Sequence, residues 1–273
     1  MQEDWDNLLI LDGCRFDMFS DSYADFLGGS LESRTSMGSA SKEFMENNFY
    51  GDSFHDTVYV SANPHSHFVP EGTFHDVITL LDTAWDEETG VVLPEDVVAA
   101  ARDAHETYPN KRLVVHFMQP HYPFIGELGQ QIEHSGVGKR TSDGDLVSST
   151  KQSKTIWAVL HYDLADVSHE DVWEAYNENL DVVMPAVESL CHELGGKTVI
   201  TADHGNLVGE WIGPLPVRGY GHPPNMYVPE LLEVPWHVIE AETRRDVVSD
   251  TPVAQTDAER EIVESRLSDL GYR

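Results

Sequence analysis

Short apolar runs alternate with amphipathic stretches along most of this chain. Each apolar run is bounded by turn-forming residues, which is typical of strands buried on both faces of a parallel sheet. The clearest is Asn7-Leu8-Leu9-Ile10-Leu11, and a second clear run starts at Arg112. The strands expected on this pattern are Asn7–Leu11, Thr57–Ser61, Arg112–Gln119, the β-branched run at Val199–Thr201 and Val234–Ile239, with Val77–Trp85 as a further candidate.

The segments between these strands favour helices. The longest starts at Ser168, carries Asp171 in the manner of a capping box, and ends before Gly195-Gly196. The other helices expected are Asp17 to about Leu27, Lys42–Phe49 with Ser41 as its N-cap, Pro94 to about Tyr108, and Thr256–Leu270. Strands alternating with helices predict an α/β fold: a mostly parallel sheet with helices on both faces.

A chain of this length can form one large α/β domain, and no linker or internal repeat divides it. We therefore expect a single domain over residues 1–273. Residues 126–158 are rich in glycine, serine and scattered charges, and they are long for a loop without structure. This stretch is interpreted as a lid or specificity insertion.

The charged residues predict a strongly acidic surface. The chain has 48 acidic and 17 basic residues, a formal net charge of −31, and the acids are spread along its whole length. Such a dispersed excess indicates a halophilic protein, because molar salt screens repulsion between carboxylates. The alternative, binding of basic partners, would normally concentrate the acids in one block. Duplex nucleic acid and anionic membranes are unsuitable partners, because no basic patch is present.

The remaining composition bears on location. The two cysteines, Cys14 and Cys191, form no disulfide framework and favour a reducing compartment. No apolar run reaches the length of a membrane span, and the N-terminus does not have the layout of a signal peptide. The expectation is a cytoplasmic protein without stable membrane insertion; its oligomeric state is not indicated.

Acidic and imidazole side chains follow several expected strands. Asp12-Gly13 ends the first strand, Asp203-His204-Gly205 ends the Val199 strand, and His121 follows the Arg112 strand, with His222 farther on. The carboxyl ends of parallel strands form the usual ligand-binding edge of an open α/β sheet. Carboxylate and imidazole groups without cysteine suit Zn²⁺, Mn²⁺ or Mg²⁺. A lone Asp or His at such a place is more often structural, and it is their coincidence that indicates a metal site.

A hydroxyl-rich stretch, Ser33–Ser41, leads into the helix expected at Lys42. A hydroxyl beside a divalent ion can lose its proton and attack an electrophile. Gly38 leaves the backbone free to present Ser39, whereas Ser41 is placed to cap the helix. Arg15 could clamp an oxyanion or simply pair with Asp17.

These motifs resemble the alkaline phosphatase superfamily, in its sulfatase-like and phosphoglycerol-transferase-like branch. The matching segments are Leu9–Gly13, the Asp203-His204 pair, Pro120–Phe124, Leu267–Tyr272 and the segment Gly38–Asn48, which is similar to the nucleophile loop of lipoteichoic-acid synthases. The resemblance implies a metal held by Asp12, Ser39, Asp203 and His204, with Ser39 as nucleophile. It also implies that His121 and His222 contact the substrate anion, assist the leaving group or hold a weak second ion; Arg15 is a further candidate for the anion because of its guanidinium fork.

Departures from the family narrow the expected activity. The nucleophile loop has no cysteine, which excludes a formylglycine sulfatase, and only His121 and His222 match the second metal site. We expect one tightly bound divalent ion per chain and a phosphoester hydrolase or phosphotransferase that forms a phosphoserine. Two alternatives stay open: a sulfate or phosphonate ester hydrolase with the same site, and an inactive binder of phosphorylated glycan or lipid head groups. Unlike the synthases, this chain shows no anchoring helix.

Overall fold

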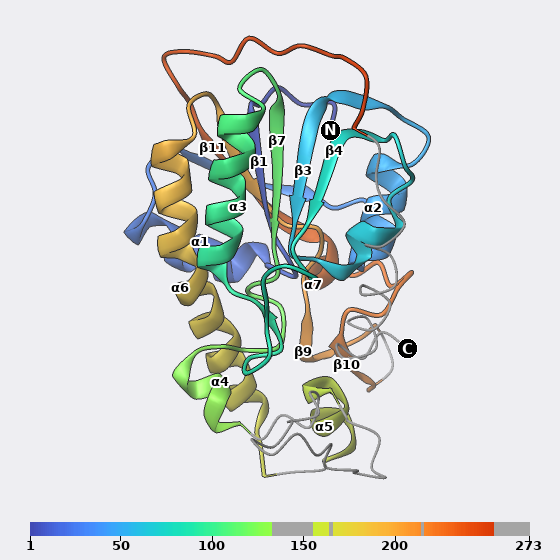
Figure 1. Cartoon of the computed structure of the whole chain (residues 1–273). Helices are drawn as coiled ribbons and strands as arrows, with labels where there is room; N and C mark the ends of the chain where they lie inside the picture. Colours follow the sequence, from blue (N-terminus) through green and yellow to red (C-terminus); the bar gives the residue numbers. More distant parts are fainter. Residues whose placement is uncertain (133–154, 164–165, 214–215, 254–273) are drawn as a thin grey trace, which may run out of the picture.

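A seven-stranded sheet forms the centre of the computed structural model, which describes residues 1–132, 155–163, 166–213 and 216–253 (Figure 1). The strand order is β2 (Ser30–Thr35), β11 (Glu233–Ile239), β8 (Thr198–Thr201), β1 (Asn7–Leu11), β7 (Arg112–Phe117), β3 (Phe54–Ser61) and β4 (Phe74–Thr79). The five strands from β8 to β4 pair in parallel, and β11 pairs antiparallel with both β8 and β2. The expected fold class, a mostly parallel α/β sheet, is confirmed.

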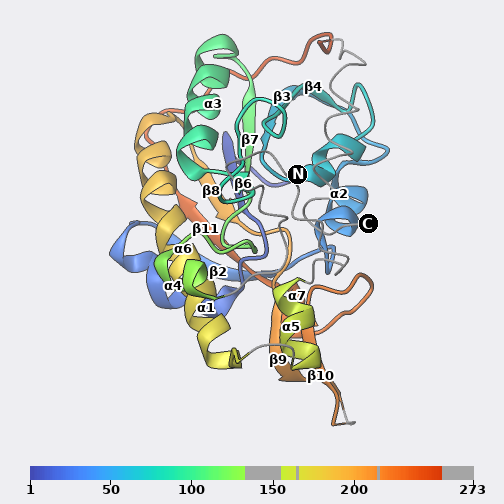
Figure 2. The same cartoon turned by 60° about the horizontal axis from the view of Figure 1, so that its bottom comes forward.

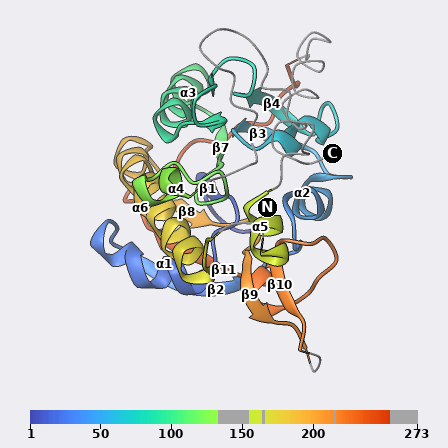
Figure 3. The same cartoon turned by 90° about the horizontal axis from the view of Figure 1, so that it is seen from below.

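Helices cover both faces of this sheet, as the uninterrupted apolar strands require. Leu9 and Leu11 of β1 point into a core shared with α3 (Pro94–Thr107) and α6 (His169–Glu193). Leu8 and Ile10 point the other way, into a core shared with α2 (Ser41–Phe49). The short helix α1 (Phe16–Ser22) joins α3 and α6 on their side, and the end-on view separates these three from α2 (Figure 3).

The smaller elements gather beyond the carboxyl ends of the parallel strands (Figures 1 and 2). They are α4 (Glu127–Gln131), α5 (Ile156–Tyr162), α7 (Pro229–Leu232), the hairpin β9 (Leu207–Trp211) and β10 (Arg218–Gly221), the short pair β5 (Trp85–Asp86) and β6 (Val91–Val92), and the 3-10 turn Pro64–Phe68. They surround the edge at which the candidate side chains lie. A second 3-10 turn, Tyr23–Asp25, follows α1, and its Tyr23 ring packs against His237 of β11.

Several boundaries differ from the expectation. Part of the hydroxyl-rich stretch forms edge strand β2, because its backbone pairs with β11. The helix expected from Asp17 ends at Ser22, and the strand expected at Val77–Trp85 is β4, ending at Thr79. The helix expected at Thr256–Leu270, the Leu267–Tyr272 motif and most of the proposed lid at 126–158 lie outside the described residues.

Among the helices of the described residues, none is both long and apolar enough to cross a membrane.

Candidate active site

Four neighbouring strands, β8, β1, β7 and β3, bring polar side chains to one edge of the sheet. Asp203 follows β8, Asp12 follows β1, and Asn63 follows β3. His116 lies within β7, where it pairs in register with Ile10 of β1. All four side chains are fully buried, so their polar atoms must find partners inside the protein.

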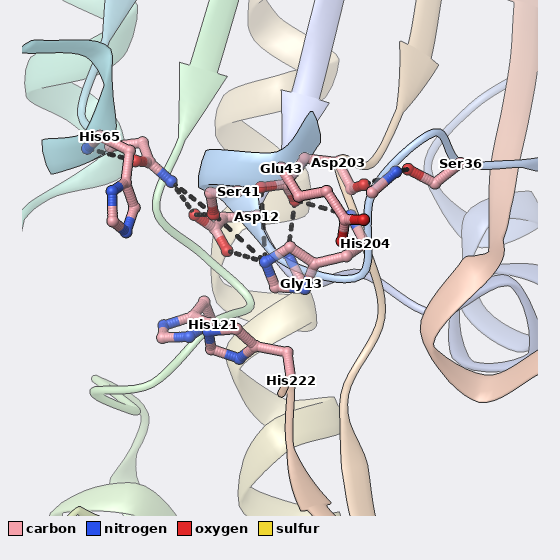
Figure 4. Close-up of polar contacts among 12 residues, drawn as sticks. Asp12, Gly13, Ser36, Ser41, Glu43, His65, His121, Asp203, His204 and His222 are labelled. Atoms are coloured by element: carbon pink, nitrogen blue, oxygen red, sulfur yellow. Dashed lines mark hydrogen bonds and ion pairs between the residues drawn. The ribbon is translucent and has the colours of Figure 1, made fainter. Parts of the chain in front are cut away.

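The two carboxylates converge with the imidazoles of His116 and His204, and Figure 4 shows Asp12, Asp203 and His204 of this group. One ligand atom from each of Asp12, His116 and Asp203 lies within 4.8 Å of the others. His116 Nε2 lies 3.8 Å from Asp12 Oδ2 and 3.7 Å from Asp203 Oδ2. His204 Nε2 lies 3.6 Å from Asp12 Oδ1 and 3.5 Å from Asp203 Oδ2. Asp203 Oδ1 is occupied by the backbone N–H groups of Gly13 and His204, which leaves Oδ2 facing the group.

Three atoms of this cluster are buried without a hydrogen-bond partner among the described residues: Asp12 Oδ1, Asp203 Oδ2 and His116 Nε2. Leaving such atoms unsatisfied costs free energy, so a group of them aimed at one point calls for a bound species. Two carboxylate oxygens and two imidazole nitrogens are a donor set that Zn²⁺ or Mn²⁺ accepts. The residues therefore fit the divalent ion expected from the sequence.

The charges of the cluster also favour a cation. Burial, together with the nearby charge of Asp203, raises the pKa of Asp12 well above its ordinary value. Burial also acts to raise the pKa of Asp203, but His204 and His116 outweigh it and the pKa is lowered. Burial lowers the pKa of His116 to about 4, so its imidazole is neutral at pH 7 and has a lone pair for a metal.

Backbone and side-chain acceptors define the tautomers of the other histidines. Nδ1 of His204 lies 2.8 Å from the Gly205 carbonyl oxygen, and Nδ1 of His121 contacts the Tyr122 carbonyl oxygen. Since a carbonyl oxygen can only accept, each Nδ1 carries a proton, and in the neutral His121 ring Nε2 therefore presents a lone pair. His222 Nδ1 lies 2.9 Å from Asn206 Oδ1, which assigns the same tautomer.

Ser41 is the hydroxyl that faces the cluster. It begins α2, and its Oγ lies 3.2 Å from His204 Nε2 and 3.4 Å from Asp12 Oδ2. The side-chain amide of Asn63 donates to Ser41 Oγ over 3.0 Å and also donates to Asp12 Oδ2. The N-terminal end of a helix favours negative charge, so this position stabilises an alkoxide or a bound anion.

Ser39 and Ser36 contact other parts of the protein. Ser39 Oγ donates to Glu43 Oε2 at 2.9 Å or to the Pro223 carbonyl oxygen at 3.0 Å, and no contact joins it to the carboxylate cluster. Ser36 Oγ donates to the backbone carbonyl of Asp203. The expected N-cap is also different: Ala40 is the N-cap of α2, and its methyl group cannot accept a hydrogen bond. Ser41 is the first residue of the helix, and its oxygen accepts from Asn63 instead.

Arg15 is engaged within the protein. Its guanidinium donates to Asp17 and Glu210 and packs over the Trp173 ring, 4.8 Å from the ring centre. The pairing with Asp17, which the sequence left as an alternative to substrate binding, is the one present. Two carboxylates thus surround the Arg15 guanidinium.

The remaining expected residues do lie together. The ring of His222 stacks on His204, with 4.4 Å between ring centres, and meets His121 edge-on at 4.8 Å. His121 Nε2 is buried without a hydrogen-bond partner in the described part of the chain. Burial, and after it the charge of His204, lowers the pKa of His121 to about 3, and burial lowers that of His222 as well.

His116 and Asn63 belong to the cluster although the sequence did not single them out as site residues. A single imidazole inside the apolar run Leu113–Met118 was the available signal for His116, since a polar side chain in a doubly buried strand needs a partner. Asn63, with His65 and His67, is more readily interpreted from the sequence as part of an ordinary loop. Its side chain instead joins Asp12 to Ser41.

No family model matches this chain, and no curated protein matches its sequence. Several solved structures are similar to it. The chain is similar to the C-terminal periplasmic domain of the phosphoethanolamine transferase EptC from Campylobacter jejuni, with 10% identity, 86% of this chain and 78% of that one covered, and a TM-score of 0.49. For the corresponding EptC domain from Escherichia coli in complex with Zn, the identity is 13%, the coverage 86% and 72%, and the TM-score 0.49.

A third similar structure is that of a protein in the alkaline phosphatase superfamily from Vibrio parahaemolyticus. Its identity is 11%, the likeness covers 89% of this chain and 62% of that one, and the TM-score is 0.48. At this level of identity no activity carries over from these proteins, so the chemistry has to come from the residues of the site itself.

Proposed function

We propose that this protein is a metal-dependent hydrolase or transferase of phosphate esters, with Ser41 as its nucleophile. The observation that carries the proposal is the position of Ser41 Oγ. It lies at the start of α2, 3.2 Å from His204 Nε2 and 3.4 Å from Asp12 Oδ2, beside buried donor atoms that have no other partner. Ser41 takes the role that the sequence resemblance gave to Ser39.

Asp12, Asp203, His204 and His116 would hold the ion, through the atoms that converge in this cluster. When bound, a divalent cation lowers the cost of an alkoxide at Ser41 and draws electron density from the ester phosphorus. His116 adds an imidazole to the ligand set expected from the sequence. Its Nδ1 lies 2.8 Å from the Tyr59 hydroxyl, which holds the ring with Nε2 toward the carboxylates.

The first chemical step forms a bond between Ser41 Oγ and phosphorus and breaks the bond between phosphorus and the leaving alcohol. The proton of Ser41 can pass to Asp12 Oδ2, 3.4 Å away, whereas His204 Nε2 would be engaged by the ion. The side-chain amide of Asn63 donates to Ser41 Oγ and orients its lone pairs. In the second step water or an acceptor alcohol attacks the phosphoserine and releases Ser41.

His121 and His222 suit that second step. Both present Nε2 lone pairs, since each Nδ1–H is held by a neighbouring oxygen, and burial keeps both rings neutral. A neutral imidazole in this tautomer accepts a hydrogen bond, so it orients an attacking water or alcohol better than it binds an oxyanion. This role differs from the anion contact that the family resemblance implies.

Acid-quench labelling tests the nucleophile. The zinc-loaded protein, incubated with a labelled aryl phosphate ester and quenched in acid, should carry phosphate on the peptide that contains Ser41. Ser41→Ala should lose the label and lower turnover by on the order of 10³-fold or more, as loss of a nucleophile does.

Ser39→Ala is the matched control, because it removes a buried hydroxyl from the same loop. It should still acquire the label at Ser41. Label on Ser39 or Ser36, or near-normal turnover by Ser41→Ala, would contradict the assignment. Zinc binding without turnover of phosphate, sulfate or phosphonate esters would contradict the enzymatic proposal as a whole.

A further inference from the structure

Ser39 and Glu43 form a compact polar contact that the proposed chemistry does not use. The Glu43 carboxylate lies one turn along α2 and accepts from the backbone N–H and the hydroxyl of Ser39, both over 2.9 Å. Gly38 lies so close to the helix that a Cβ there would fall 2.2 Å from the backbone nitrogen of Phe44. The loop before the nucleophile is therefore pressed against the first turn of α2.

The same two side chains also hold a second, distant segment. The Ser39 hydroxyl is 3.0 Å from the Pro223 carbonyl oxygen and accepts from the Met226 N–H over 3.3 Å. The Tyr227 hydroxyl donates to Glu43 Oε1, and the Asn225 N–H approaches Glu43 Oε2 at 3.4 Å. We call Ser39, Glu43 and residues 223–227 the latch.

The latch joins two halves of the candidate site. On one side is α2, which begins at Ser41. On the other, residue 223 directly follows His222, whose ring stacks on His204 and meets His121. Ser39 is completely buried, which shields its own hydrogen bonds to residues 223–227 from water, whereas the contact of Tyr227 with Glu43 is exposed. Burial raises the pKa of Glu43, but the hydrogen bonds from Tyr227 and Ser39 outweigh it and keep the pKa below its ordinary value.

We propose that Ser39 and Glu43 are positioning residues that tie the segment after His222 to the helix of the nucleophile, and so hold the His222 imidazole over the substrate site. The proposal rests on the proposed function, since it assigns a purpose to the position of His222 in that site. It also gives the conspicuous Ser39 a role other than attack on phosphorus.

A double-mutant cycle between Ser39 and His222 tests this directly. If Ser39 acts through His222, Ser39→Ala should lower kcat for an aryl phosphate ester by roughly tenfold and change KM by less than about threefold, because His222 orients the attacking water while Ser41 and the ion donors stay in place. In the His222→Ala background, Ser39→Ala should then have no further effect on kcat. Glu43→Gln should resemble Ser39→Ala, and Lys42→Gln, an exposed neighbour on the same helix, should resemble the wild type.

Amide hydrogen exchange supplies a readout that needs no turnover. The N–H of Met226 should exchange faster in Ser39→Ala, because its acceptor is gone, and the zinc affinity of that variant should equal that of the wild type. The decay rate of the phosphate label on Ser41, measured in the same four proteins, gives the same cycle for the second step alone.

The outcomes separate the two proposals. A wild type that binds zinc but turns over no ester overturns the proposed function, and the exchange of the Met226 N–H still decides the latch. Effects of Ser39→Ala and His222→Ala on kcat that multiply in the double variant would overturn the latch, as would a Ser39→Ala protein with unchanged Met226 exchange.

Discussion

At the scale of single residues, the buried carboxylate of Asp12 lowers the stability of the ion-free protein. Its carboxylate is fully buried beside that of Asp203, and burial together with this like charge raises its pKa well above the ordinary value of 3.8. An Asp whose pKa is raised by folding destabilises the folded state at any pH above that folded pKa. The penalty disappears below the ordinary pKa, where the group is protonated in both the folded and the unfolded chain.

Replacing Asp12 should therefore stabilise the ion-free protein. Asp12→Asn keeps the shape and an acceptor for Asn63 but removes the charge. At pH 7 the ion-free variant should be more stable than the ion-free wild type by on the order of 1 kcal/mol, since one pKa unit corresponds to about 1.4 kcal/mol. Urea unfolding in the presence of a chelator measures this, and the difference should vanish at pH 3.

Zinc should make the wild type more stable than Asp12→Asn, the reverse of the order expected without the ion. Saturating the wild type at a hundred times its dissociation constant adds about 2.7 kcal/mol, while Asp12→Asn should gain little. Elemental analysis after dialysis should find about one ion per wild-type chain, on the proposed donor set. A wild type that stays metal-free and gains no stability from Zn²⁺ or Mn²⁺ would contradict the metal site.

At the scale of elements, two helices that each begin beside a serine use that residue differently. Ser168 caps α6: its oxygen accepts from the Asp171 N–H over 3.1 Å, and Asp171 returns a bond to the Ser168 N–H over 2.7 Å. This capping box was predicted from the sequence and is confirmed. Ser41 makes no such bond, because its oxygen faces Asp12, His204 and Asn63.

Substitution by alanine should distinguish these roles. Ser168→Ala should lower the free energy of unfolding by about 1 kcal/mol, the usual cost of a lost N-cap. Ser41→Ala, which removes no cap, should cost less than about half of that while abolishing turnover. Chemical denaturation followed by circular dichroism measures both, and equal losses would mean that Ser41 has a capping role after all.

At the scale of the whole molecule, the excess of acidic residues is the main electrostatic influence on stability. The 17 basic residues cannot neutralise 48 acidic ones, although several are engaged in pairs such as Arg244 with Asp4 and Asp6 or Lys197 with Glu240. Exposed pairs of this kind contribute little free energy each. Repulsion among the unpaired carboxylates is therefore the larger electrostatic effect on stability.

Salt should consequently stabilise this protein. The screening length falls from about 10 Å at 0.1 M to about 3 Å at 1 M, so repulsion between neighbouring carboxylates fades. The melting temperature should rise by several degrees between 0.1 M and 1 M KCl and should not rise in an uncharged osmolyte of equal osmolality that is not excluded from the surface. An unchanged or lower value in KCl would contradict the halophilic interpretation.

Local sequence patterns were sufficient to predict the sheet and the helices that cover it. Doubly apolar runs such as Leu8–Leu11 can only be buried on both faces, so strand positions and the covered parallel sheet follow from the order of residues along the chain. The strand-end rule likewise placed Asp12, Asp203 and His204 at one edge, and the structure brings them together. These inferences need only neighbours in sequence and a general rule of sheet geometry.

What the tertiary structure decided is which side chain points where. Ser39 and Ser41 are two residues apart in one loop, and only the contacts with Asn63 and Pro223, from remote parts of the chain, turn Ser41 toward the carboxylates and Ser39 away. His116 faces the cluster because β7 lies next to β1 in the sheet, and Arg15 is occupied because Glu210 reaches it from β9. Each depends on residues far apart in sequence, whose meeting the packing of the whole chain determines.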